Sequence, residues 1–559
     1  MNVASVKSEY YTSLYAQYCQ TKPDASAVPS VRKLLNSSFQ FTGLLPRHVY
    51  KKNLAIVDYA SLKGDEENRL AAKSAHVTLS ELNGGLGITI KRNRYLRRVL
   101  GLSSFSEIQL RPKSLDLFFS VGNNSKDKKC VEEIRLLNLC KASSMYRCIW
   151  IQQLIKKETK AFFDEFFRGI SCLEHLRKSN VHIRKPIFDN KYPTIDFYNG
   201  MLDYRELAPG GHGEVGFVEL LNPKEKIQKG SIKVICNGNS VNTSLDPYIV
   251  GWMLRYRIPL VIVTKTKGKG DINGGHFGMC NNDNTYVLDM AEIHKNDLDI
   301  YGDLVSYKRL VKYGENPQLV NTNTIYINES ELHPFLKALR KIVSKDKFVD
   351  IIKPDLIKNA KEVNGKKLIQ LESSLVTPFL SLGKFLDTTS VQKVRTLKAK
   401  YGIKKLITLV NLTEGEALNF CTPIKYAFDL WVQASSDRFY LDQNGWLLLS
   451  ETKRKLYLDK DFIHNEFYQD LENCYSSFGN ASTISLDSLN IKGKVNLKDA
   501  ILIGDVSINS DFPGIFDLNS SFGRKQLGQL QNERVVLKDV RINIGESGVL
   551  HSLKNRTVL

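Results

Sequence analysis

Residues 77–87 read VTLSELNGGLG, a short strand-forming apolar run that ends in a glycine-rich turn. Glycine has no Cβ, so the backbone N–H groups of such a turn can approach a ligand closely. Further along, RPKS at residues 111–114 supplies Lys113, whose ammonium group can contact phosphate oxygens. A strand, a glycine-rich turn and a following lysine are typical of nucleotide sites, although an ordinary tight turn has the same composition.

Apolar β-like runs alternate with helical patterns between residues 71 and 450. Clear examples of such runs are residues 232–236, 260–263 and 324–327. This alternation predicts an α/β domain with a mostly parallel sheet covered on both faces, where ligands bind beyond the carboxyl ends of the strands. The glycine-rich turn, Asn237 and Lys265 each follow such a run or lie near its end. We therefore expect one shared site at this edge of the sheet.

The composition bounds the class of protein. At 559 residues the chain is long enough for two or three domains with cores of their own. Its 42% hydrophobic and 25% charged residues are typical of globular proteins, and no apolar run approaches the length of a membrane span. Residues 1–7 show no secretory pattern, which predicts a cytoplasmic location. The nine cysteines are scattered without metal-ligand spacing, as expected of reduced thiols.

The formal net charge of +20 raises the alternative of an anionic partner such as nucleic acid. The densest basic cluster is KRNRYLRR at residues 91–98. No helix-turn-helix, zinc-finger or RNP-type motif accompanies this cluster. We therefore expect most lysines and arginines to lie on solvated surface, and we do not expect nucleic acid to be a partner.

The two ends of the chain differ from its middle. Residues 1–70 begin with a helical pattern and carry no recognisable chemistry, so we expect an N-terminal helical cap on the next domain. Residues 71–450 would form the catalytic domain. Residues 451–559 contain short strands of alternating polarity joined by Gly, Asn and Asp. Taken alone, these strands fit a small stacked β-solenoid or a β-sandwich about equally well.

Five motifs in order along residues 77–430 carry a resemblance to a known family. They are LNGGLG at 82–87 with RPKS at 111–114, PGGHGE at 209–214, NTNT at 321–324, IQLE at 369–372 and PIK at 423–425. The set resembles the UDP-sugar pyrophosphorylase family, which has LNGGLGT with GPKS, PPGHGD, NTNN, IQLE and PVK. The resemblance implies a Rossmann-like nucleotidyltransferase domain and a C-terminal left-handed β-helix domain, often used for self-association. A homo-oligomer through residues 451–559 is therefore a further expectation.

The resemblance also implies a reaction, in which UTP and a sugar 1-phosphate give a UDP-sugar and pyrophosphate. The uracil and ribose of UTP would lie against the backbone of four residues: Leu82, Asn83, Gly84 and Gly85. Gly211 and His212 would contact the nucleotide, with His212 near the α-phosphate. Asn190 lies near the position of a uracil-reading Gln in the family, and its amide offers a donor and an acceptor on a shorter arm. Members with GHG at this motif tend to use glucose 1-phosphate, which favours that sugar here.

Two lysines are the predicted catalytic residues by the same resemblance. Lys113 would contact the UTP phosphates, and Lys425 would bridge the sugar phosphate and the departing pyrophosphate. In-line transfer at phosphorus needs positioning and positive charge rather than covalent help from the protein. The sugar 1-phosphate would be bound by four residues: Asn237, Lys267, Asp289 and Asn323.

Mg²⁺ is the expected cofactor, because a divalent cation bridges phosphate oxygens in this reaction. The family has NxDNLG after a core strand, and its Asp binds the metal. Here NGNSVN at residues 237–242 places Asn239 at that position, and an amide oxygen lacks the charge that anchors a hard cation. Three alternatives stay open: an active uridylyltransferase with an altered metal site, a degenerate regulatory member that binds nucleotide without turnover, and a nucleic-acid-binding module that uses the basic insertion at 88–110.

Overall fold

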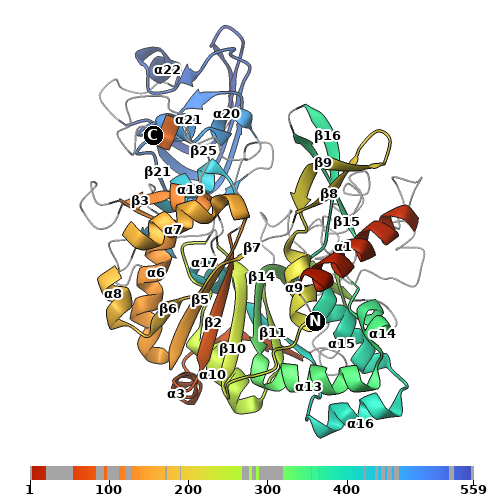
Figure 1. The fold of residues 1–559 in the computed structure, drawn as a ribbon. Coiled ribbons are helices and arrows are strands. Elements are labelled where there is room, and N and C mark those ends of the chain that lie inside the picture. The colour runs from red at the N-terminus through yellow and green to blue at the C-terminus, as the bar shows by residue number, and fades with distance from the viewer. Residues whose placement is uncertain are drawn as a thin grey trace.

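A large mixed β-sheet lies at the centre of the molecule, with helices on both of its faces (Figure 1). The structure is a computed structural model that describes residues 3–20, 55–83, 94–96, 112–120, 128–169, 173–188, 191–238, 240–266, 276–279, 285–288, 319–353, 356–363, 365–420, 422, 424–434, 438–441, 447–449, 456–458, 462, 465–527 and 534–554. The main path of the sheet follows this order: β1 (Ala55–Asp58), β17 (Ile407–Leu412), β11 (Leu260–Thr266), β14 (Leu319–Asn328), β10 (Ser231–Asn237), β2 (His76–Leu82), β5 (Cys148–Ile155) and β6 (Val181–Ile183).

Most pairs in this sheet are parallel. β2 runs parallel to β10 and β5, and β17 runs parallel to β1 and β11, whereas β14 is antiparallel to both β10 and β11. Three short strands pair beside this path: β7 (Ile187–Phe188), β12 (His276–Met279) and β13 (Thr285–Leu288). The predicted mixed, mostly parallel α/β sheet is therefore confirmed.

Both faces of the central sheet are apolar, because alternate residues of a strand point to opposite sides. On β11, Leu260 and Ile262 join one buried cluster, while Val261 and Val263 join another. Helices over the first cluster are α9 (His212–Leu221), α13 (Glu329–Ile342), α14 (Lys345–Ile351), α15 (Thr377–Thr388) and α16 (Gln392–Lys400). Helices over the second are α3 (Glu66–Ala72), α6 (Val131–Ala142), α8 (Leu173–Lys178), α10 (Pro247–Tyr256) and α17 (Glu414–Phe420).

A second, antiparallel sheet projects beside the first and carries the N-terminal helix (Figure 1). Its strands are β15 (Ile357–Val363), β16 (Lys366–Glu372), β8 (Lys191–Asp196) and β9 (Leu202–Pro209), in that order. α1 (Val3–Gln20) packs against α9 and β16, as a cap would. β1 lies within the predicted cap at residues 1–70, and α3 crosses its C-terminal boundary. β1 nevertheless pairs with β17 and so belongs to the central sheet. The division of the chain at residues 70 and 450 stays a prediction.

The C-terminal region stacks parallel strands. β21 (Ser482–Lys492), β23 (Ile501–Ser510) and β25 (Val536–Ile544) pair in parallel, and so do the short strands between them, β22 (Val495–Asn496) and β24 (Phe516–Asp517). β20 (Tyr457–Leu458) and β26 (Leu550–Lys554) pair at the two edges. Sandwich domains are built from antiparallel pairs, so this arrangement favours the solenoid. The left-handed β-helix stays a prediction.

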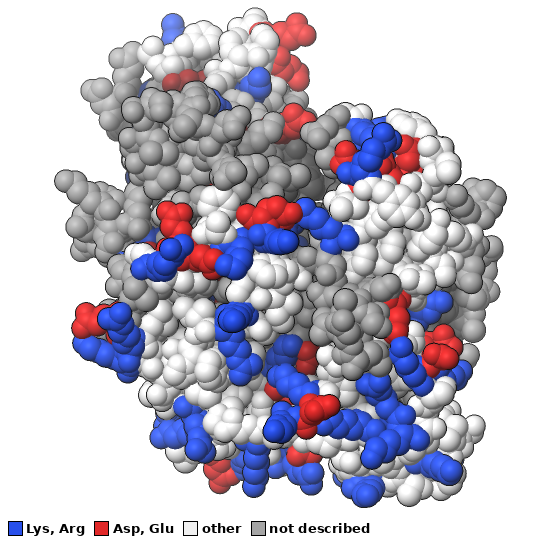
Figure 2. All heavy atoms as spheres, viewed as in Figure 1, with Lys and Arg blue, Asp and Glu red and all other residues white. Residues whose placement is uncertain are grey.

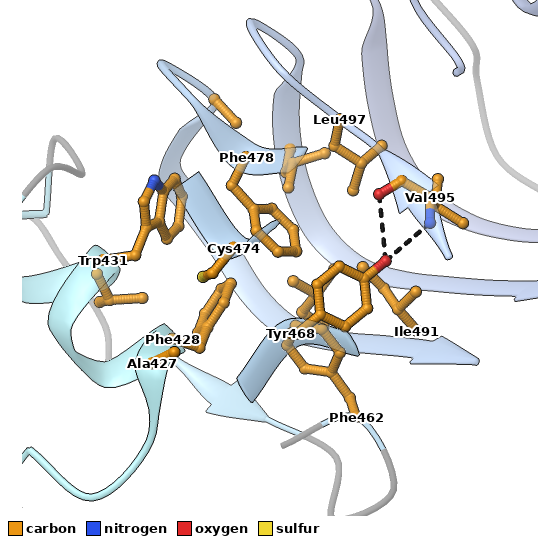
Figure 3. Close-up of a cluster of buried hydrophobic side chains, with 14 of the residues drawn as sticks. Ala427, Phe428, Trp431, Phe462, Tyr468, Cys474, Phe478, Ile491, Val495 and Leu497 are labelled. Atoms are coloured by element: carbon orange, nitrogen blue, oxygen red, sulfur yellow. Dashed lines mark hydrogen bonds between the residues drawn. The ribbon is translucent and has the colours of Figure 1, made fainter. Parts of the chain in front are cut away.

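An aromatic core joins the C-terminal region to α18 (Ala427–Ala434), as Figure 3 shows. The ring of Phe428 meets that of Phe478, on α21 (Leu471–Phe478), edge to face at a centroid distance of 4.9 Å. Trp431 is fully buried beside them. Tyr468, on α20 (Glu466–Gln469), donates its hydroxyl to the carbonyl of Val495 at 3.1 Å. α18 is therefore held by both parts of the chain.

Short elements complete the chain. They are α5 (Lys113–Asp116), β3 (Phe118–Ser120), β4 (Lys128–Cys130), α7 (Lys160–Gly169), β18 (Phe439–Leu441), β19 (Leu447–Leu449) and α22 (Ser521–Gln526). Lysines and arginines lie over much of the lower half of the face in Figure 2, several of them beside acidic residues. One ion pair among the described residues joins Arg257 to Glu331 at 2.8 Å. Among the described helices, none combines the length and the apolar character needed to cross a bilayer.

Candidate active site

The carboxyl ends of the parallel strands bring the first site residues together. Leu82 ends β2 directly opposite Asn237, which ends β10. Gly238 donates its backbone N–H to the carbonyl of Leu82 at 3.3 Å. A Cβ on Gly238 would lie 1.9 Å from Oδ1 of Asn83, so this crossing of two chains requires glycine. The predicted shared edge therefore holds Leu82, Asn83 and Asn237.

A buried polar network anchors the start of the glycine-rich turn. The side-chain amide of Asn83 donates to Oε1 of Gln153 and, at 3.4 Å, to Oε2 of Glu132. The Nε2 group of Gln153 donates to Glu132 at 2.7 Å and to Glu81 at 2.5 Å. All four side chains are buried. Burial, together with the charge of Glu81, raises the pKa of Glu132 well above its usual value.

Arg135 of α6 ties this network to the loop that follows β10. Its guanidinium is completely buried and forms an ion pair with Glu81. It also donates to the carbonyls of Ser240 at 2.7 Å, Asn237 at 3.3 Å and Asn242 at 3.5 Å. Burial alone lowers the pKa of Arg135, but the attraction of Glu81 outweighs it and keeps the guanidinium charged. One guanidinium thus fixes both the end of β2 and the 237–242 loop.

The two predicted catalytic lysines lie on neighbouring segments. Lys113, at the start of α5, donates its Nζ to the carbonyl of Ile424, 311 positions further along the chain. The next residue is Lys425, whose side chain is exposed. Asp429 accepts the backbone N–H groups of Lys425 at 2.9 Å and Tyr426 at 2.8 Å, which satisfies two backbone donors at the start of α18. Lys113 at the start of α5 and Lys425 just before α18 therefore lie on adjoining segments.

The PGGHGE and IQLE motifs pack against each other. Gly211 has φ of +78°, and a Cβ there would lie 2.7 Å from the Cβ of Glu372. Gly213 donates its N–H to the carbonyl of Ser373 at 2.9 Å. His212 is the first residue of α9, and its side chain is reached by solvent although protein surrounds it closely. Desolvation by the surrounding protein lowers the pKa of His212, so its imidazole is neutral at neutral pH.

The NTNT motif lies where the pairing of β11 with β14 changes register, and its Asn323 has a strained backbone conformation. Asn323 has φ of +57°, the left-handed region that non-glycine residues rarely enter. Its N–H donates to Oδ1 of Asn321 at 2.9 Å, and its Oδ1 accepts from Nδ2 of Asn321 at 3.0 Å. Thr322 donates to the carbonyl of Val263 at 2.8 Å, beside the irregularity in the pairing of β11 and β14. Strain of this kind gathers at functional sites, and Nδ2 of Asn323 has no partner among the described residues.

A family profile described as UTP–glucose-1-phosphate uridylyltransferase matches residues 172–503 of this chain. The chain belongs to the UTP–glucose-1-phosphate uridylyltransferase family. The predicted family resemblance is confirmed.

Relatives and solved structures agree with this membership. The UTP–glucose-1-phosphate uridylyltransferase of Musa acuminata is 23% identical over 473 residues, which are 81% of this chain and 83% of that protein. UTP–glucose-1-phosphate uridylyltransferase 2 of Dictyostelium discoideum is 22% identical over 321 residues, 57% of this chain and 55% of that protein. A mutant UDP-glucose pyrophosphorylase of Leishmania major, in complex with UDP-glucose, shares the fold with a TM-score of 0.58 at 15% identity, over 96% of this chain and 99% of that one.

Several predicted site residues lie outside the described residues, so their roles stay predictions. They are Gly84, Gly85, Asn190, Asn239, Lys267 and Asp289. The residues that sequence reasoning missed are Glu81, Glu132, Arg135 and Gln153. Glu81, near the end of an apolar strand, was the available signal, because a buried charge requires a partner.

The loop at residues 237–242, which is predicted to hold the metal, offers only neutral oxygens. No acidic residue occurs between Asn237 and Asp246. Asp246 does not substitute, because one carboxylate oxygen accepts from the hydroxyl of Tyr59 at 2.7 Å and the other from the N–H of Ile249 at 2.9 Å. The described donor set therefore lacks the carboxylate that a resident Mg²⁺ prefers, and the buried guanidinium of Arg135 lies beneath the same loop.

Another cluster has metal-ligand geometry but belongs to the opposite end of β10. Glu219, Glu329 and His333 place their ligand atoms within 4.8 Å of one another. Lys233 forms an ion pair with Glu219, and Lys224 forms one with Glu329. Two ammonium groups already neutralise these carboxylates, so the cluster is a structural polar network.

Proposed function

We propose that this chain is a uridylyltransferase that forms UDP-glucose and pyrophosphate from UTP and glucose 1-phosphate. The observation that supports the proposal is the contact of Lys113 with the carbonyl of Ile424, because it joins the segment of Lys113 to the segment that carries Lys425. Two cations that both reached the phosphates would suit a reaction in which negative charge grows on a departing pyrophosphate. The family to which the chain belongs, with its UTP–glucose-1-phosphate uridylyltransferases, supports the same reaction.

The proposed chemistry is a direct displacement at phosphorus. A phosphate oxygen of glucose 1-phosphate attacks the α-phosphorus of UTP, while the bond from that phosphorus to the bridging oxygen breaks and pyrophosphate leaves. The attacking oxygen is already ionised, so no protein base is needed. Lys113 and Lys425 would neutralise charge on the phosphates, and neutral His212 would donate an N–H to the α-phosphate. The N-terminus of α9, where His212 lies, also favours an anion.

Sugar binding would fall to Asn237 and Asn323, at the ends of β10 and within β14. Asn323 uses its Oδ1 to accept from Asn321, and its Nδ2 group would donate to a sugar hydroxyl. Mg²⁺, when bound, supplies further neutralisation of the triphosphate. The described loop offers no carboxylate to hold that ion, only neutral oxygens such as those of Asn237 and Asn242. A cytoplasmic location and self-association through residues 451–559 stay predictions.

Pyrophosphate release tests the proposal. The wild-type chain would be incubated with UTP and, in separate reactions, with the 1-phosphates of glucose, galactose and N-acetylglucosamine, with and without Mg²⁺. We expect turnover that is highest with glucose 1-phosphate and depends on Mg²⁺. UTP binding without turnover on any of the three sugars would contradict the proposal and favour the degenerate, regulatory alternative.

A further inference from the structure

The N-terminal helix reaches the loop that precedes His212. Tyr10 of α1 is fully buried, and its hydroxyl donates to the carbonyl of Gly210 at 2.7 Å, across 200 positions of sequence. Burial, with the nearby charges of Glu214 and Glu372, raises the pKa of Tyr10 well above its usual value. The phenol therefore stays protonated and remains a hydrogen-bond donor throughout the range in which the protein is folded.

The ring of Tyr10 is fixed by its neighbours. It packs against Phe217 of α9 at a centroid distance of 5.6 Å and against Tyr192 of β8 at 6.4 Å. A Cβ on Gly210 would lie 3.0 Å from the Cε1 atom of Tyr10 and 2.8 Å from the ring of Tyr192. The loop thus lies directly on two aromatic rings, and glycine is required for that approach.

Two consecutive glycines need such external support. Gly210 and Gly211 have wide backbone freedom, and Gly211 occupies the positive-φ region. The loop is held at three points: Tyr10 binds the carbonyl of Gly210, Gln370 donates to the carbonyl of Pro209 at 2.6 Å, and the N–H of Gly213 binds Ser373. Of these three hydrogen bonds, the one from Tyr10 is made to Gly210 itself, and its donor comes from the N-terminal helix.

We propose that Tyr10 is a positioning residue for the nucleotide site. By holding the carbonyl of Gly210, it fixes the Gly210–Gly211 turn and thereby the place of His212 and of the α9 N-terminus. The N-terminal helix is then part of the catalytic apparatus rather than a passive cover. This inference rests on the proposed role of His212 beside UTP.

Tyr11 provides a matched control on the same helix. Its hydroxyl also donates to a backbone carbonyl, that of Pro193 in β8, and its ring stacks on Tyr192 at 4.6 Å with an interplanar angle of 1°. Tyr10→Phe and Tyr11→Phe each remove one hydroxyl and leave the ring in place. They differ in which carbonyl loses its partner, the nucleotide-site turn or β8.

The test compares these two variants by deuterium exchange of backbone amides and by steady-state kinetics. An unsatisfied buried carbonyl corresponds to roughly a tenfold effect or more. We expect Tyr10→Phe to exchange amides in residues 210–213 about tenfold faster and to raise KM for UTP about tenfold, with KM for glucose 1-phosphate changed less than about twofold. In Tyr11→Phe we expect exchange over residues 210–213 and KM for UTP to stay at the wild-type values.

The outcomes separate the inference from the function on which it rests. Equal exchange over residues 210–213 and equal KM for UTP in the two variants would overturn the positioning role of Tyr10. Faster exchange in Tyr10→Phe alone, with no turnover in the wild type, would support its hold on the turn and overturn the proposed uridylyltransferase.

Discussion

Removal of the buried guanidinium of Arg135 should have two effects at once: it should destabilise the fold, and it should release the loop at residues 237–242 from its anchor. Arg135→Met keeps a side chain of similar length but leaves the carboxylate of Glu81 buried without its ion-pair partner. It also leaves the carbonyl of Ser240 without the donor that lies 2.7 Å away. Both losses occur beneath the proposed nucleotide site, so stability and turnover should fall in the same variant.

The magnitude follows from these two losses. Breaking a buried ion pair by deleting one partner costs about 3–5 kcal/mol. Leaving a buried carbonyl unsatisfied adds about 1–3 kcal/mol. Glu81→Gln in the same chain removes the uncompensated charge, while its amide oxygen can still accept from Gln153. The double variant should therefore recover about 2 kcal/mol or more of the loss, while the loop stays without its anchor.

Urea unfolding of the wild type, both single variants and the double variant measures this coupling. We expect the free energy of unfolding to fall most in Arg135→Met and to rise again when Glu81→Gln is added. Pyrophosphate release should stay low in the double variant, because the loop at residues 237–242 has lost three hydrogen bonds. Additive effects of Arg135→Met and Glu81→Gln would refute the account of Arg135 as the partner of Glu81. Full turnover in the double variant would refute its role in holding the loop.

Three further predictions concern the reaction itself. Lys113→Met should lower kcat about 100-fold or more, because a cation facing the departing charge is lost, while loss of the hydrogen bond to Ile424 should cost at most about 1–3 kcal/mol of stability; unchanged turnover would remove Lys113 from the site. Asn239→Asp should preserve or raise turnover and reduce the Mg²⁺ concentration needed, whereas a higher Mg²⁺ requirement would argue against this position as a metal ligand. Binding of UTP should raise the depressed pKa of His212 and take up a proton, so UTP affinity should increase as pH falls below about 6.5 more steeply in the wild type than in His212→Asn; equal slopes would contradict the placement of His212 beside a phosphate.

Local patterns in the sequence predict the central sheet well. The apolar runs at 232–236 and 260–263 lie within β10 and β11, because residues that are buried on both faces leave a nearly continuous apolar pattern. The run at 324–327 also forms a strand, β14, but an antiparallel one. A strand that is buried on both faces has the same apolar pattern whether it runs parallel or antiparallel to its neighbours. The composition of residues 324–327 therefore does not reveal the direction of β14.

The candidate site was visible in the sequence only where its residues lie in motifs. Lys113 was predicted from its own segment, but its contact with the carbonyl of Ile424 depends on a chain 311 positions away. Tyr10 and Arg135 were missed for the same reason, because their partners carry no local signature. The basic cluster at residues 91–98 was predicted to lie on solvated surface. One of its members, Arg94, forms an ion pair with Asp470 of the same chain at 2.8 Å.

Formation of UDP-glucose by the wild-type chain, followed beside Lys113→Met, tests the central claim most directly. The account predicts that UTP and glucose 1-phosphate give UDP-glucose and pyrophosphate in equal amounts, and that the Lys113 variant binds UTP but is slower by about 100-fold or more. A wild-type chain that binds UTP yet forms no UDP-glucose would contradict the account.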